Sequence, residues 1–258
     1  MKTILALTLA LTATLLPITA AEAQPIVTTN QNVETKKTDD TKKAEAAKPA
    51  ADKSTDKKEP EKPDIKELMK EANFTNSTGM LMVKISPSMW AGKFEVTQEE
   101  YQKIAGGNPG KFAGGRNPVD SVSWTEAKDF CAKLNEAEKK DELLPEGYAY
   151  TLPTQAQWES LVGGAELKDA VTSERGSKSG TAAVGSLGEN SLGLCDVRGN
   201  LWEFCLDPQD KQYRVLRGGA WNTSYEPQLR LEFKWFSNGP DDKKENYGFR
   251  VVLVPEGQ

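Results

Sequence analysis

The sequence changes character near Leu68, and this boundary limits how much of the chain can fold. From about residue 28 to residue 66 it consists mainly of Lys, Glu, Asp, Ala, Thr and Pro, with no aromatic residue. Such a segment buries too little apolar surface to offset the conformational entropy that folding removes. We therefore expect residues 24–66 to be a disordered tether and residues 67–258, about 190 residues, to form one domain with a single core.

The tether has two interpretations. A flexible chain of about 40 residues has a root-mean-square reach of roughly 35 Å, so it can space the domain away from a surface. It is equally read as a low-complexity tail without such a role.

The first residues have the layout of a secretory signal peptide. Met1 and Lys2 precede an apolar run over residues 4–16, and Ala21-Glu22-Ala23 supplies an A-x-A cleavage motif. As a membrane anchor the run is too short, because spanning hydrocarbon takes about 20 apolar residues. We expect residues 1–23 to be removed and the mature protein to be secreted or periplasmic in the cell envelope. No cysteine lies near the cleavage site, so a lipid anchor is not expected. Because the apolar run is short and is removed with the signal peptide, membrane insertion after cleavage is not expected either.

Residue counts exclude several classes of function. The formal net charge is −5 and the aromatic residues are not interleaved with basic clusters, so nucleic acid is not an expected partner. The chain has no histidine, which excludes Ser-His-Asp and Cys-His catalysis and the metal sites that depend on imidazole. Its three cysteines are too few for a disulfide framework, and Cys195 and Cys205 either form one bridge or pack singly.

Three short helices are predicted in the folded part. Thr97, Ser123 and Thr154 each begin an S/T-x-x-E/Q pattern, in which the hydroxyl and the third side chain satisfy reciprocal backbone N–H groups. In the second helix, residues 127, 130, 131 and 134 form one apolar stripe, which we assign to the core. Cys131 on that stripe is expected to be a packed thiol and not a reactive one.

The strands predicted from the sequence are short and widely spaced. Glycine, asparagine and proline turns separate them, so the pattern predicts an α+β domain with much irregular structure. The candidate strands are residues 81–85, 93–96, 213–216 and 249–254.

Five segments occur in a recognisable order. They are residues 93–98, 117–131, 152–159, 193–204 and 217–221, and the series closes with Gly248-Phe249-Arg250. The series resembles the sulfatase-modifying-factor, or formylglycine-generating-enzyme, family over about residues 79–255. The resemblance implies a fold related to C-type lectins, in which short sheets and long loops surround a few helices. It does not extend to the signal peptide or the tether.

The resemblance implies a calcium ion at the fourth segment. The matching ligands are the carboxylates of Asp196 and Glu203 and the backbone carbonyls of Gly199 and Leu201. Calcium takes six to eight oxygen ligands, so these groups with waters make a site of modest affinity. The alternative is that Asp196 and Glu203 only accept hydrogen bonds within the turn.

The resemblance also implies where catalysis would occur. Active members hold a copper ion on two cysteines that follow the Arg-Gly-Gly motif, and the matching positions here are about Thr223 and Gln228. Soft Cu(I) requires thiolates, but residues 222–230 contain no cysteine, and Ala220 replaces the usual serine. A second branch of the fold binds iron through three histidines, which this chain lacks. We therefore assign no catalytic residue and expect no bound copper.

The same region is a candidate ligand groove. Its aromatic, amide and arginine side chains suit recognition of a peptide or a glycan. Alternation from residue 229 to residue 235 also fits an ordinary strand with one face in the core. The candidate groove residues are Asn222, Thr223, Tyr225, Gln228, Arg230 and Trp235.

Three functions are open at this stage. The leading hypothesis is a non-catalytic envelope module that binds an exported protein or a glycan. The second is a maturation oxidase of the formylglycine-generating type that acts on an exported protein and holds copper in another way. The third is a structural component of an envelope assembly.

Overall fold

The computed structural model describes residues 70, 73–176, 179–208 and 212–257. The predicted signal peptide and tether therefore lie outside the described residues. No helix within the described ranges is long and apolar enough to cross a membrane.

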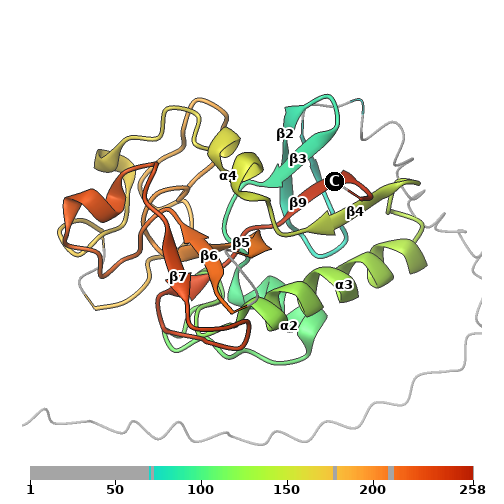
Figure 1. Cartoon of the computed structure of the whole chain (residues 1–258). Coiled ribbons are helices and arrows are strands. Elements are labelled where there is room, and N and C mark those ends of the chain that lie inside the picture. The colour runs from blue at the N-terminus through green and yellow to red at the C-terminus, as the bar shows by residue number, and fades with distance from the viewer. Residues whose placement is uncertain (1–69, 71–72, 177–178, 209–211, 258) are drawn as a thin grey trace, which may run out of the picture. The chain divides into compact units, whose positions relative to one another are not determined.

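A five-stranded sheet forms one half of the described domain (Figure 1). Its order is β1-β2-β3-β9-β4, and every neighbouring pair is antiparallel. The strands are β1 (Asn73–Thr75), β2 (Leu81–Ser86), β3 (Met89–Gly92), β4 (Tyr148–Thr151) and β9 (Val252–Pro255).

A four-stranded sheet forms the other half, in the order β7-β6-β5-β8. β5 pairs antiparallel with β6 and parallel with β8. The strands are β5 (Trp202–Pro208), β6 (Arg214–Arg217), β7 (Trp235–Ser237) and β8 (Tyr247–Gly248). The chain passes from this sheet to the first within three residues, because β8 ends at Gly248 and β9 begins at Val252.

The three predicted helices are confirmed, with their caps. α2 (Gln98–Ala105), α3 (Trp124–Lys140) and α4 (Gln155–Leu161) each begin with a complete capping box. In the first, Thr97 Oγ1 accepts from Glu100 N at 3.3 Å while Thr97 N donates to Glu100 Oε2 at 2.8 Å. Short 3₁₀ turns occupy Leu167–Asp169 and Glu226–Leu229.

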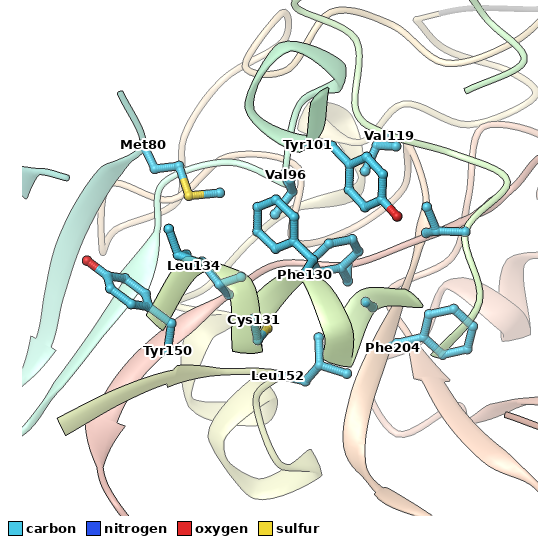
Figure 2. Packing of buried hydrophobic residues seen from close by; sticks show 14 of the residues in the cluster. Met80, Val96, Tyr101, Val119, Phe130, Cys131, Leu134, Tyr150, Leu152 and Phe204 are labelled. Carbon is cyan, nitrogen blue, oxygen red and sulfur yellow. The ribbon is translucent and has the colours of Figure 1, made fainter. Parts of the chain in front are cut away.

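The apolar stripe of α3 lies in the core, as predicted. Ala127, Phe130, Cys131 and Leu134 are each at most 2% exposed. Figure 2 shows the last three among the side chains of the neighbouring elements. The ring of Phe130 stacks on Tyr101 of α2 with centroids 5.4 Å apart. Burial raises the pKa of the Cys131 thiol to about 12, so this cysteine is a protonated core residue, as expected.

Two of the predicted strands are wrong in extent. Residues 93–96 are a bend and not a strand, because the chain leaves the sheet after Gly92 and turns the Glu95 carboxylate inward to Leu201 N. Residues 249–251 are the link between the sheets, and only Val252–Pro255 is strand. Hydrogen bonds formed by buried polar side chains, which the apolar pattern does not reveal, interrupt both segments.

Candidate functional site

The loop over residues 193–203 is held in a conformation that requires glycine. Gly199 has φ +82°, a region that favours glycine, and a Cβ there would lie 2.3 Å from the Val171 carbonyl oxygen. Its N–H donates to Gly218 O of the Arg-Gly-Gly turn at 3.0 Å. The loop therefore packs directly against two other segments of backbone.

Asn200 ties this loop to three further segments. It is fully buried with φ 57°, and its Oδ1 accepts from Ala182 N at 3.0 Å. Its Nδ2 donates to Glu95 Oε2 at 2.7 Å, and its carbonyl accepts from Trp221 N at 2.8 Å. The sequence motif contains Asn200, but nothing in its spacing indicates these partners.

Arg250 joins the two sheets from the short link between them. Its guanidinium is fully buried, and NH2 donates to Glu203 Oε1 and to the Cys195 carbonyl, both at 2.7 Å. NH1 donates to the carbonyls of Gly92 at 2.8 Å and Lys93 at 2.9 Å. One side chain thus satisfies a carboxylate of β5 and three main-chain oxygens.

Three buried carboxylates surround this arginine, so acidic groups are in excess. Burial raises the pKa of Asp196 to about 6. Burial, and then the carboxylates of Asp196 and Glu203, raise the pKa of Glu95 well above its usual value. Asp196 Oδ2 accepts from Gly185 N at 2.6 Å, while its Oδ1 has no hydrogen-bond partner among the described residues.

A groove of about 550 Å³ opens beside Thr223. The residues that line it are Leu167, Lys168, Thr172, Glu174, Arg175, Thr223, Ser224, Glu226 and Leu229. None of these described residues is a cysteine or a histidine. The volume lies within the range of about 300–1,000 Å³ that is typical of ligand pockets.

Thr223 itself is a structural part of the groove floor. Its residue is 5% exposed, and its Oγ1 accepts from Ala220 N at 3.0 Å. Its carbonyl accepts from Ser173 Oγ at 3.1 Å and from Ser173 N at 3.4 Å. Hydrogen bonds to the backbone therefore hold Thr223 in place. Its hydroxyl already accepts one of these bonds.

The cysteines pack singly in the described part of the chain. Cys195 and Cys205 are both buried and neither is in a disulfide. Burial raises the pKa of each thiol, so neither is an activated thiolate. This decides between the two alternatives that the sequence left open.

The family model described as a sulfatase-modifying factor enzyme 1-like domain matches residues 16–254. The chain belongs to this family. The match begins well before the segment, residues 79–255, that the motifs cover. The α+β fold, related to that of C-type lectins, is the one that the motifs implied.

Two curated relatives of this chain carry names that describe different roles. The chaperone protein LppX of Paenibacillus barcinonensis is 25% identical, over 63% of this chain and 79% of its own length. The inactive C-alpha-formylglycine-generating enzyme 2 of Mus musculus is 28% identical, over 52% of this chain and 48% of its own length. The chain thus spans about half of the mouse relative.

A solved structure with the same fold is Treponema denticola variable protein 1. It superposes with a TM-score of 0.57 at 25% identity, covering 65% of this chain and 84% of that protein. The likeness therefore extends over nearly all of the Treponema protein.

The structure separates the six predicted groove residues of this family member. Of the six, only Thr223 is among the described residues that line the groove. Tyr225 is 62% exposed and does not line it, although its sequence neighbours Ser224 and Glu226 do. Asn222 does not line the groove, and its Oδ1 accepts a hydrogen bond from Asn246 Nδ2 at 3.1 Å. Gln228 is half-buried in the 3₁₀ turn Glu226–Leu229, and Arg230 is exposed directly after it.

Trp235 lies away from the groove. It is in β7, its ring stacks on Trp202 with centroids 5.9 Å apart, and its Nε1 donates to Tyr247 Oη at 2.9 Å. The alternation from residue 229 to residue 235 is present as alternating exposure, but only Trp235–Ser237 forms strand.

The charge around the predicted calcium ligands favours a cation, but their geometry does not form a metal site. The excess of carboxylates and the unpartnered Asp196 Oδ1 favour a cation. Glu203, in contrast, is occupied by Arg250 and by Trp158 Nε1, which donates to its Oε2 at 2.9 Å. No three Asp, Glu, Cys or His side chains in the described ranges converge on a metal position. Calcium stays a prediction.

Thermal melting with calcium and with a chelator tests the predicted calcium site. Calcium at a hundred times its dissociation constant stabilises a folded protein by about 2.7 kcal/mol, which raises Tm by about 5–10 °C in a domain of this size. The rise should be absent in Asp196→Asn. Equal melting midpoints with calcium and with a chelator would remove the site.

The buried Asp196 carboxyl should make stability depend on pH. Its folded-state pKa of about 6 lies above its usual 3.8, so the native state binds the proton more tightly than the unfolded state. The free energy of unfolding should therefore fall as pH rises from about 4 to about 6. In chelator at pH 8, Asp196→Asn should be more stable than the parent by up to about 3 kcal/mol.

Urea unfolding of both proteins at pH 4 and pH 8 measures this difference. Asparagine tolerates the φ of 56° at this position, and its amide oxygen can still accept from Gly185 N. Parallel pH dependence of the two proteins would show that Asp196 does not carry the effect.

Proposed function

We propose that this chain is an exported, non-catalytic module of the cell envelope that binds a protein or glycan ligand in the groove at Thr223. One observation carries the proposal. The groove of about 550 Å³ is open at the position that matches a catalytic cysteine of active relatives, yet no thiol lines it. A ligand site without the metal-binding groups supports binding and not oxidation.

The positions of the cysteines support the same proposal. Cys131 lies on α3, Cys205 on β5 and Cys195 beside Arg250, and all three are buried. Thiolates are the ligands that Cu(I) requires. The Thr223 hydroxyl cannot replace them, and it already accepts a hydrogen bond from Ala220 N.

The names of two relatives are in keeping with a binding role. The mouse relative is described as inactive, so membership of this family is compatible with a scaffold that has lost the reaction. The Paenibacillus relative is described as a chaperone, a role that depends on binding another protein.

We expect no oxidase activity. Oxygen consumption by the protein with copper and a cysteine-containing sulfatase peptide should equal that of copper and peptide alone, because no thiolate pair is available. An active formylglycine-generating enzyme provides the positive control. Consumption above the level of copper and peptide alone, with formylglycine in the peptide, would make this chain a maturation enzyme instead.

Pull-down from envelope extracts distinguishes the two non-catalytic functions. A binding module should recover one ligand in a saturable manner. Stoichiometric recovery of several proteins together would instead identify a structural component of an assembly.

A further inference from the structure

Main-chain groups of Thr172, Arg175 and Thr223, three of the nine residues that line the groove, form hydrogen bonds within the protein. Thr172 N donates to Arg175 O at 2.8 Å, and Arg175 N donates to Thr172 O at 3.1 Å. Thr223 N donates to Ala220 O at 2.9 Å, and its carbonyl accepts from Ser173. Extended peptides are commonly recognised through a ladder of main-chain hydrogen bonds, and these groups cannot supply one. At these three positions recognition of a ligand therefore falls to side chains.

The side chains that line the groove include both hydrogen-bond donors and hydrogen-bond acceptors, and their formal charges sum to zero. Lys168 and Arg175 donate, Glu174 and Glu226 accept, and all four are exposed; Lys168 Nζ also lies 3.2 Å from Glu166 Oε1. The hydroxyl of Ser224 can do both. Such a set matches a neutral ligand that is rich in hydroxyl groups, because each hydroxyl donates and accepts.

Tyr225 is an exposed residue at the edge of this polar set, although it is not itself among the residues that line the groove. Its residue is 62% exposed, although large apolar side chains are normally buried, and its neighbours in sequence both line the groove. An exposed aromatic ring offers a flat apolar surface together with a polar tip. The C–H face of a pyranose ring is complementary to such a surface.

From these features we infer that the groove binds a neutral oligosaccharide, with Tyr225 as the stacking platform and Glu226 as a hydrogen-bond acceptor. The inference rests on the proposed binding function and narrows its ligand to one chemical class. Protein ligands become an alternative outcome of the test.

Binding of defined trisaccharides to the full mature chain tests the inference. The probes are trisaccharides of glucose, of mannose and of N-acetylglucosamine, with a sialylated trisaccharide and a pool of random decapeptides for comparison. Saturation-transfer NMR detects binding, and calorimetric titration measures Kd. Tyr225→Ala should weaken binding of a neutral trisaccharide about tenfold or more, and Glu226→Gln about fivefold.

Phe236→Ala is the matched control, because Phe236 is 40% exposed on β7 and, unlike Tyr225, has no sequence neighbour that lines the groove. It should leave Kd unchanged. If the protein binds only the decapeptides, and Tyr225→Ala abolishes that binding, the inference of a saccharide ligand is wrong but the proposed binding function stands. A preference for the sialylated probe, or equal Kd values in all variants, would also overturn the inference. If no probe binds, the saccharide inference is also wrong. The oxygen-consumption and pull-down assays then test the proposed function separately.

Discussion

Replacing Arg250 with methionine should lower the free energy of unfolding by about 3–5 kcal/mol, because the change leaves Glu203 as an unpaired buried charge. Both side chains are fully buried, and NH2 lies 2.7 Å from Glu203 Oε1. The substitution also removes the donors to the carbonyls of Gly92, Lys93 and Cys195. Since these groups belong to both sheets, the loss should affect the whole described domain.

Two further variants separate charge from geometry. Lys243→Ala breaks an exposed ion pair with Glu126 and should cost less than about 1 kcal/mol. Arg250→Lys keeps the charge but not the planar fork of donors, so its stability should fall between the other two. Urea unfolding monitored by tryptophan fluorescence measures all three. A methionine variant no less stable than Lys243→Ala would refute the role assigned to Arg250.

Replacing Gly199 with alanine should destabilise the protein by about 2–5 kcal/mol. The φ of +82° alone costs an alanine about 1–2 kcal/mol. The added Cβ would also lie 2.3 Å from Val171 O, a backbone atom that cannot move without disturbing Asn200 N, which donates to it at 2.8 Å. Overpacking of this kind typically adds about 1–3 kcal/mol.

Gly193 in the same loop provides a control with the same backbone angle. Its φ is +81°, but a Cβ there would meet no atom within 4 Å. Gly193→Ala should therefore show only the conformational cost of about 1–2 kcal/mol. Comparing the two unfolding midpoints isolates the steric part. Equal losses would show that the approach of Val171 to Gly199 does not limit the loop.

Helix starts and the core face of α3 were predictable because they depend on local chemistry. A capping box joins residues three positions apart, so Thr97, Ser123 and Thr154 indicated their helices correctly. The stripe around Phe130 follows from the helical period alone. The motif also pointed to Thr223, which lines the groove of the structure, but the other five predicted residues are not among its lining residues.

Other parts of the candidate site were not predictable from spacing. Trp235 has the composition of a groove residue, but packing against Trp202 draws its ring away from the groove. Lys168, Glu174 and Arg175 line the groove from a segment about 50 residues earlier, which no local pattern connects to Thr223. Only a fold in which long loops meet can bring them together.

The sequence by itself determined the starts of the helices, the α+β class and the family, and it showed that residues 222–230 contain no cysteine and that the chain contains no histidine. These conclusions depend on which residues are present and on contacts within a few positions. Only the tertiary structure decided that Arg250 pairs with Glu203, that Cys195 and Cys205 stay apart, and which side chains form the groove. The reason is physical. A buried charged or polar group is stable only with a partner, and the fold supplies that partner from a segment tens to hundreds of residues away in the chain.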